Sequence, residues 1–456
     1  MKTLLKGGTV VTGNDVSNLD VLIEDEKIVK IQENITDPDA HIVNVENKLL
    51  FPGFIDAHTH FDLEVAETVT ADDFETGSRA ALLGGTTTVI DFATQYHGES
   101  LNKAFANWLV KAKDKASCDY GFHMAISDWN GSVNDEIQDM IELGVTSFKL
   151  YMTYDDMVVN DKQIYQILKR LKEVGGITGV HCENSGIIKA LVEEQKKLGN
   201  LGTASHPLTR PVQVEAEAVN RLLRISEIAD TPIIIVHLSS MAGYEEILRA
   251  RERGQEVYVE TCMQYLLLDE SLYSLPSPEG FKYMISPPLR KEEDRTGLWS
   301  AVSNNQIQTI STDHCSFSMK QKMAGEHDFT AIPCGMPGVQ DRAVLLYTYG
   351  VRGNRITLSQ MCRLLSENPA KLYGAFPRKG RIAVGADADI VVFDPQFSGV
   401  ISAKNQAYNM DYAPFEGYKT NGLIETVYLR GRKVVDNHEI IAEHEGTYLK
   451  RSTYCL

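Results

Sequence analysis

Short apolar runs rich in β-branched residues alternate with longer amphipathic segments through most of the chain. The longer segments have helical periodicity, as in residues 161–174 and 213–228. Strand alternating with helix eight times is typical of a (β/α)8 barrel of roughly 250 residues. We therefore predict an α/β protein with a TIM barrel over residues 51–379. The eight runs that predict its strands lie between residue 51 and about residue 313: FPGFIDAH, TTTVIDFA, YGFHMAI, TSFKLYM, ITGVHCE, PIIIVHL, EVYVETC and IQTISTD.

Two β-rich segments flank the predicted barrel. Residues 1–50 consist of short strand-like runs separated by turns, and residues 380–435 have the same character. Neither segment is long enough to bury a hydrophobic core by itself. We therefore predict that the two pair into one small β-sandwich, followed by a polar tail over residues 436–456. Two interpretations of this tail stay open: an arm onto a neighbouring subunit, or a loose end.

Histidines and an aspartate stand at the ends of several predicted strands. His58 and His60 are two residues apart on an extended segment, so their side chains leave the same face. His181, His237 and Asp313 each follow another apolar run. The active site of a (β/α)8 barrel lies at the carboxyl ends of its strands, where these side chains are predicted to meet. Imidazole and carboxylate groups are typical ligands of zinc and similar divalent ions.

Lys149 lies in the predicted strand TSFKLYM with no acidic residue beside it. A protonated lysine cannot coordinate a cation, so it joins a metal cluster only if its amine captures CO2 as a carbamate. The carbamate is an anionic group with two oxygens, which can bridge two metal ions. Two ions about 3.5–4 Å apart can hold one hydroxide and polarise a carbonyl. This pattern predicts a two-metal hydrolase.

Each of these residues also has an ordinary interpretation. A single histidine after an apolar strand is usually a satisfied core residue, and His-x-His pairs also arise by chance. Asp313 fits the N-cap of a following helix, and Lys149 fits a lysine with a buried stem and a solvated amine. Their shared position at one end of the predicted barrel is what favours a metal site.

The composition excludes several classes of function. The chain has 45 basic and 62 acidic residues and a net charge of −17, which argues against a nucleic-acid partner. No apolar run approaches the roughly 18 residues of a membrane span. Glycines interrupt the N-terminal segment MKTLLKGGTVV before a signal-peptide core can form. The seven cysteines lack CxxC spacing, so we expect free thiols and a cytoplasmic protein.

Motifs spread along almost the whole chain resemble one enzyme family. They are GFIDAHTH, FKLYMTY, VHCEN, SHPLTRPVQVEAEAV, ETCMQYL, SPPLR, STDHCSF, IPCGMPG, NPAKLYG and GADADIVVFDP. Together they resemble the hydantoinase and dihydropyrimidinase branch of the amidohydrolase superfamily, and within it the D-hydantoinases and phenylhydantoinases most. The resemblance implies a barrel with a flanking sandwich. It also implies hydrolytic opening of a cyclic ureide, a 5-substituted hydantoin or a dihydropyrimidine, to the N-carbamoyl amino acid.

The resemblance also implies a metal centre. Two divalent ions, expected to be Zn²⁺, would be bridged by Lys149 in the form of N6-carboxylysine. Asp313 would act as general base toward the bridging hydroxide and then as general acid toward the departing ring nitrogen. The implied ligands are His58, His60 and Asp313 for one ion, and His181 and His237 for the other.

Three further residues match substrate-binding positions of the family. Tyr154 matches the tyrosine that hydrogen-bonds the developing oxyanion, although a loop tyrosine more often serves packing. Ser286 and Cys334 match positions whose backbone groups hold the amide edge of the ring. The family commonly has asparagine where this chain has Cys334. If the contact is made by the backbone, this change alters the shape of the pocket; if a side-chain amide matters, it alters ring preference.

The expected specificity residues are mostly apolar or aromatic: Phe61, Leu63, Tyr151 and Met157. An apolar wall favours a ring with an uncharged substituent over one with a carboxylate. Dihydroorotases usually have arginine two places after the His-x-His pair, where this chain has Asp62, which argues against that activity. An allantoinase-like ureide hydrolase stays open as an alternative.

A function of another class also stays open. Some relatives of this family are oligomeric scaffold proteins that kept the fold and lost metal ligands. This chain keeps all six ligand positions, which favours an enzyme. Homotetramers are common in the family, so we expect one here.

Overall fold

Eight parallel strands form a barrel in the computed structural model, which describes residues 2–65 and 67–456. Neighbours in the sheet follow the chain order. The sheet closes where Thr59 pairs with His314, and the backbone N–H of His60 donates to the carbonyl of His314 at 2.8 Å. The prediction of a (β/α)8 barrel is confirmed. The strands are β8 (Phe54–Thr59), β11 (Thr86–Thr94), β12 (Asp119–Ala125), β13 (Ser147–Tyr151), β14 (Ile177–His181), β15 (Ile233–Ile235), β16 (Val257–Cys262) and β17 (Thr309–Ser311).

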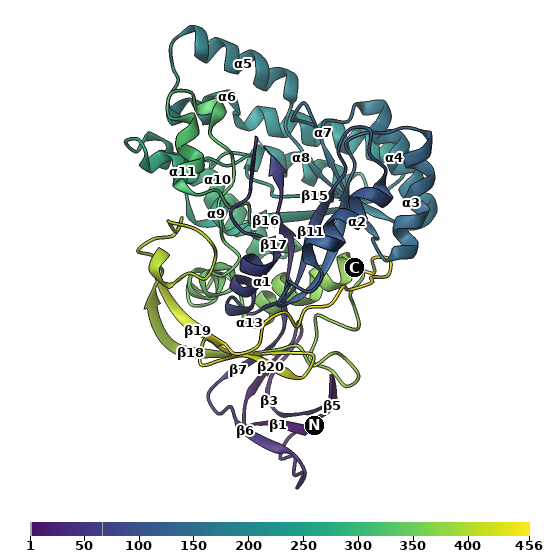
Figure 1. Cartoon of the computed structure of the whole chain (residues 1–456), viewed down its shortest axis with the longest axis vertical. Helices are drawn as coiled ribbons and strands as arrows, with labels where there is room; N and C mark the ends of the chain where they lie inside the picture. Colours follow the sequence, from purple (N-terminus) through teal and green to yellow (C-terminus); the bar gives the residue numbers. More distant parts are fainter. Residues whose placement is uncertain (1, 66) are drawn as a thin grey trace.

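Helices connect successive strands and cover the outside of the barrel (Figure 1). In α4 (Asp161–Val174), the buried residues recur at helical spacing: Ile164, Ile167, Leu168 and Leu171. Asn160 caps the first turn of α4, and Gly175 follows its last turn with a left-handed φ of 75°. The sequence therefore sets both the buried stripe and the ends of this helix. The other helices are α1 (Phe74–Leu83), α2 (Leu101–Ala112), α3 (Gly131–Leu143), α5 (Ser185–Lys197), α6 (His206–Thr209), α7 (Val212–Ala229), α8 (Met241–Glu252), α9 (Met263–Leu267), α10 (Glu292–Ser303), α11 (Met319–Lys322), α12 (Arg342–Leu345), α13 (Leu358–Cys362) and α14 (Asn368–Leu372).

Apolar side chains fill the barrel toward the amino ends of its strands. Residues from β8, β11, β14, β15 and β16 meet there, together with Leu372 at the end of α14. This part of the barrel interior is thus a packed core. The strand residues of this cluster include Ile55, Ile90, Ile177, Ile234 and Tyr258.

Strands from both ends of the chain form two further sheets beside the barrel, drawn in purple and yellow at the bottom of Figure 1. The two sheets share one apolar core, to which Leu5, Ile23, Ile390 and Tyr428 belong. One sheet has the order β5 (Lys27–Gln32), β4 (Asp20–Glu24), β1 (Lys2–Lys6), β6 (His41–Asn44). The other has the order β21 (Glu439–Ile440), β20 (Arg432–Asp436), β19 (Lys419–Leu429), β18 (Ile390–Val400), β7 (Leu49–Pro52), β2 (Thr9–Val11), β3 (Val16–Asn18).

The C-terminal residues lie along the barrel of their own chain. The backbone N–H of Leu449 donates to the carbonyl of Tyr120 at 2.7 Å, and the buried guanidinium of Arg451 donates to the hydroxyl of Ser147 at 2.8 Å. Such contacts order the tail within one chain, and its role as an arm onto another subunit stays a prediction. No helix in residues 2–65 and 67–456 combines the length and apolarity that crossing a bilayer requires.

Candidate active site

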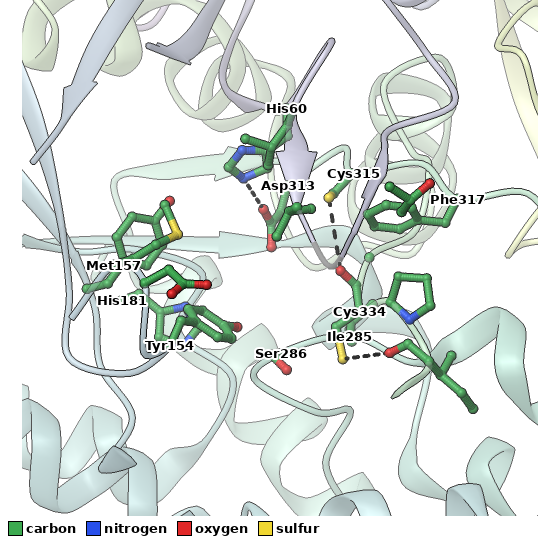
Figure 2. Close-up of a pocket in the computed structure, with 18 of the residues that line it drawn as sticks. His60, Tyr154, Met157, His181, Ile285, Ser286, Asp313, Cys315, Phe317 and Cys334 are labelled. Carbon is green, nitrogen blue, oxygen red and sulfur yellow. Dashed lines mark hydrogen bonds and ion pairs between the residues drawn. The ribbon is translucent and has the colours of Figure 1, made fainter. Parts of the chain in front are cut away.

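A pocket of about 900 Å³ opens at the carboxyl ends of the barrel strands (Figure 2). Its volume is in the range of small-molecule sites. All six side chains predicted as metal ligands line it: His58, His60, Lys149, His181, His237 and Asp313. The structure thus brings together residues that are spread over more than half of the sequence.

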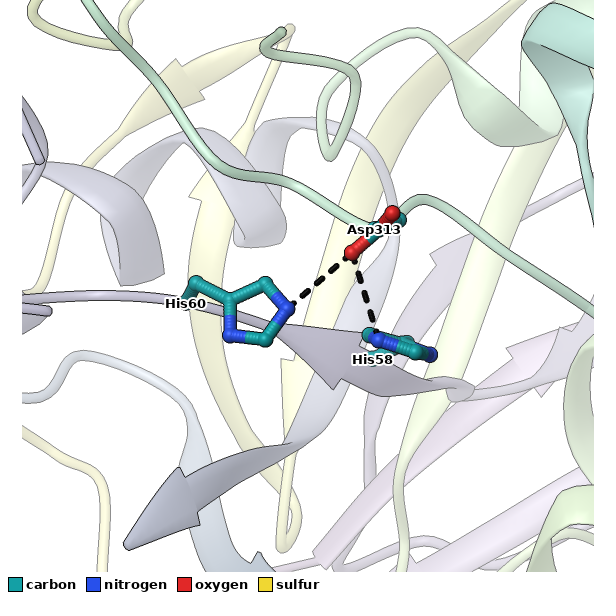
Figure 3. Close-up of side chains that lie close together, drawn as sticks. All are labelled: His58, His60 and Asp313. Atoms are coloured by element: carbon teal, nitrogen blue, oxygen red, sulfur yellow. Dashed lines mark hydrogen bonds and ion pairs between the residues drawn. The ribbon is translucent and has the colours of Figure 1, made fainter. Parts of the chain in front are cut away.

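His58, His60 and Asp313 form the tightest group, because β8 and β17 are neighbours where the barrel closes (Figure 3). One ligand atom from each lies within 4.8 Å of the others. The Oδ1 atom of Asp313 lies 3.2 Å from Nε2 of His58 and 3.0 Å from Nε2 of His60. Two imidazoles and a carboxylate at this spacing are a suitable donor set for a divalent cation.

Lys149, His181 and His237 lie next to this group. The Nζ atom of Lys149 is 3.5 Å from Nε2 of His58, and the rings of His181 and His237 have centroids 4.6 Å apart. Lys149 is only 1% exposed. Among the described residues, no carboxylate lies within ion-pair distance of its amine. Burial lowers the pKa of Lys149 to about 8, which raises the fraction of its amine that is neutral near pH 7.

Two buried glutamates fix the tautomers of two of these histidines. Glu260 accepts from Nδ1 of His58 at 2.6 Å, and Glu183 accepts from Nε2 of His181 at 2.8 Å. A histidine that binds a metal usually donates its other ring N–H to a carboxylate, so the contacts with Glu260 and Glu183 leave Nε2 of His58 and Nδ1 of His181 with their lone pairs for a cation. Glu183 is in turn paired with Arg210. The Nδ1 atom of His237 is buried without a hydrogen-bond partner, which also fits a bound cation.

Burial sets the charges of the site. Burial, and then the charge of Lys149, hold the pKa values of His58 and His237 well below the usual range, so both imidazoles are neutral. Burial opposes the ionisation of Asp313, but the neighbouring imidazoles of His58 and His60 hold the pKa of its carboxyl well below its usual value. Burial raises the pKa of Tyr154, whose phenol therefore stays a hydrogen-bond donor.

Three of the predicted site residues have left-handed backbone conformations that non-glycine residues rarely adopt. The φ angles are 70° at Tyr154, 36° at His237 and 52° at Asp313. Such conformations cost about 1–3 kcal/mol each and persist only where the surrounding structure requires them. Here they turn the chain at strand ends so that the side chains face the pocket.

The other residues predicted to contact substrate line the same pocket, with one exception. Phe61 is a correction, because its ring is fully buried against Phe74 and His314, with centroids 5.6 and 5.4 Å away. The reason is strand alternation: consecutive side chains leave opposite faces, so Phe61 points away from the side of His60. The predicted residues that do line the pocket are Leu63, Tyr151, Tyr154, Met157, Ser286 and Cys334.

Three residues that shape the site were not predicted from the sequence: Glu183, Arg210 and Glu260. A signal existed for Glu260, which is an acidic residue inside the apolar strand EVYVETC, and for Glu183, which lies two residues after His181. Arg210 had no such signal, because it lies between α6 and α7 and reaches the pocket only in the folded chain.

The chain is similar to known proteins over its whole length. The amidohydrolase family profile matches residues 49–434. A D-hydantoinase of Geobacillus stearothermophilus is 44% identical over 100% of this chain and 97% of that protein. A D-phenylhydantoinase of Escherichia coli strain SE11 is 38% identical over 100% of this chain and 99% of its own length. The crystal structure of a dihydropyrimidinase from Brevibacillus agri NCHU1002 matches with a TM-score of 0.99 and 42% identity over 100% of both chains.

The matches extend from the β-sandwich strands through the whole barrel, and they include every strand that bears a predicted ligand. The chain therefore belongs to the amidohydrolase family, within its hydantoinase and dihydropyrimidinase branch.

Proposed function

We propose that this protein opens the ring of a 5-substituted hydantoin or a dihydropyrimidine by hydrolysis and releases the N-carbamoyl amino acid. The single observation that supports this most is the convergence of six potential ligands on one pocket of about 900 Å³. Relatives named D-hydantoinase and D-phenylhydantoinase, matched over the whole chain, give the reaction class. The same names favour the D-enantiomer of a substituted hydantoin.

The family implies a divalent metal centre, and the proposed form of it is two Zn²⁺ ions with Lys149 as N6-carboxylysine between them. Support comes from the buried donor set and from the absence of an ion-pair partner for the Lys149 amine in the described residues. When bound, such a pair supplies Lewis acidity toward the ring carbonyl and a hydroxide nucleophile at neutral pH. The residues proposed to hold it are His58, His60 and Asp313 on one side, His181 and His237 on the other, and Lys149 between.

Asp313 is the proposed general base and acid. Its carboxylate takes a proton as water oxygen bonds to the ring carbonyl carbon. As the carbon–nitrogen bond breaks, Asp313 returns this proton to the departing ring nitrogen, so the ring opens to a ureido group and a carboxylic acid, which loses its own proton to solvent near neutral pH. The Tyr154 phenol, kept protonated by burial, donates to the carbonyl oxygen where negative charge develops.

The walls of the pocket favour a ring with an uncharged substituent. Leu63, Tyr151 and Met157 contribute apolar or aromatic surface, and Asp155 and Asp156 also line the pocket. The apolar and aromatic surface supports hydantoins and dihydropyrimidines with an uncharged substituent over carboxylated rings. The backbone groups of Ser286 and Cys334 are proposed to hold the amide edge of the ring.

A substrate panel combined with metal analysis tests the proposal. The purified protein should contain about two zinc ions per chain and turn over phenylhydantoin or dihydrouracil faster than allantoin. Faster turnover of allantoin than of the other two rings would support the alternative that the protein is an allantoinase-like ureide hydrolase. Protein with no metal and no turnover of any ring would support the scaffold alternative.

Two further properties belong to the proposal. A homotetramer is expected, and light scattering should give about four times the mass of one chain. The cytoplasm is the proposed location, because all seven cysteines are free and six of them are at least partly buried. Stable disulfides in the isolated native protein would argue against a reducing compartment.

A further inference from the structure

Lys322, the last residue of α11, is a fully buried lysine that the proposed reaction does not use. Its amine has no carboxylate within ion-pair distance in the described part of the chain. A buried cation without a counter-ion is costly unless hydrogen bonds satisfy it. Burial lowers the pKa of Lys322 to about 8, so near pH 7 most of it is still an ammonium with three N–H donors.

All three donors of this ammonium have backbone partners in two loops that line the pocket. Lys322 Nζ donates to the carbonyls of Pro333 at 3.0 Å and Gly335 at 2.8 Å, on either side of Cys334. It also donates to the carbonyl of Met284 at 3.3 Å, two residues before Ser286. One side chain therefore ties together the two segments that are expected to hold the ring edge.

Other buried groups hold the remaining carbonyls near Ser286. The imidazole of His206 donates to the carbonyl of Ile285 at 2.7 Å, and the hydroxyl of Tyr265 donates to that of Pro287 at 2.8 Å. The backbone N–H of Gly335 donates to the carbonyl of Met284 at 2.8 Å, which links the two loops directly.

The backbone N–H groups of Ser286 and Cys334, by contrast, donate no hydrogen bond to another backbone group within residues 2–65 and 67–456. Both residues line the pocket (Figure 2). Backbone donors of pocket-lining residues that lack a partner in the protein are available to a bound ligand. The neighbouring carbonyls, which accept hydrogen bonds from buried groups, keep these two N–H groups in place.

We propose that Lys322 is a positioning residue for substrate: it fixes the distance between the Ser286 and Cys334 loops so that their backbone groups match the amide edge of the ring. This inference rests on the proposed function. It also accounts for Cys334, because a contact made by the backbone tolerates a change of side chain. Lys322 is not a catalytic residue, since its three N–H groups are already engaged and it does not line the pocket.

The variant Lys322→Met removes the three donors while it keeps an unbranched apolar stem. Lys320→Met is the matched control, because Lys320 lies on the same short helix and is exposed. The measurements are zinc content, kcat and KM for unsubstituted hydantoin and for 5-phenylhydantoin, and amide hydrogen exchange of peptides that cover residues 280–290 and 330–338.

We expect Lys322→Met to retain zinc and to raise KM at least tenfold by a common factor for both rings, because both present the same amide edge. Its kcat should change less than threefold, and exchange should accelerate only in the two loop peptides. Lys320→Met should match the wild type. Lys322→Gln, which keeps two N–H donors, should give an intermediate KM. It replaces Lys322→Met in the test if the methionine variant does not fold.

An unchanged KM in both Lys322 variants, or unchanged exchange of the two loops, would overturn the positioning role while the proposed function stands. A KM change for only one ring would also overturn it, because the substituent and not the amide edge would then be affected. A wild-type protein that opens none of the rings overturns the proposed function and this role together.

Discussion

The carboxylate of Glu260 offers a direct test of how the histidines are held. Its Oε1 accepts from Nδ1 of His58 at 2.6 Å and from the backbone N–H of His237 at 3.3 Å, and its Oε2 accepts from Ser311 Oγ at 2.8 Å. Glu260→Ala removes the acceptor that orients the His58 ring. A hydrogen bond to a charged group is worth about 1.5–3 kcal/mol. The metal affinity should therefore fall about 10–150-fold.

The assay is competition for Zn²⁺ between the metal-free protein and a chromophoric chelator at pH 7.5. Glu260→Gln keeps an acceptor for His58 but loses the charge, so its affinity should fall by less than that of the alanine variant. Ser311→Ala is the control, because it leaves both contacts of Oε1 in place. If Glu260→Ala bound Zn²⁺ as tightly as the wild type, the carboxylate would not be what orients His58.

Three further predictions concern the bridge, the base and the stability of the fold. Lys149→Ala should lose most of the zinc and all measurable activity, with partial rescue by short-chain carboxylates; normal turnover would refute the carbamate. Asp313→Asn should keep much of the zinc and lose at least about 100-fold in kcat, the scale of general acid–base catalysis, and a near-normal rate would exclude that role. Lys379→Met breaks contacts of 2.6 Å to both Asp119 and Asp389, so the unfolding free energy should fall by about 3–5 kcal/mol, seen as an earlier thermal transition. Burial alone would lower the pKa of Lys379, but the surrounding carboxylates raise it above its usual 10.5. The difference in unfolding free energy between the wild type and Lys379→Met should therefore be complete below pH 10.5 and should shrink as the pH rises further. If the two proteins were equally stable at pH 7, the ion-pair argument would be contradicted.

The sequence by itself determined the local structure and the residue types at the strand ends. The apolar runs specify strands and the stripe on α4 specifies a helix, because side-chain periodicity records which face of an element is buried. The two-residue spacing of His58 and His60 put both on one face, since alternation along a strand is a local property. The same rule, applied one residue further, would have excluded Phe61 from the pocket.

Only the tertiary structure decided which of these groups meet. Asp313 reaches His58 because the first and last barrel strands pair, and no local pattern records a contact between residues 255 positions apart. Glu260 lies beside His58 because β16 pairs with β17 next to the point where the barrel closes. Lys322 is the clearest case: in the sequence it is one lysine of a polar helix, and only the packing of two loops around it turns it into a buried cation bound to three carbonyls. Long-range packing decides what lies opposite a buried face, whereas periodicity shows only that the face is buried.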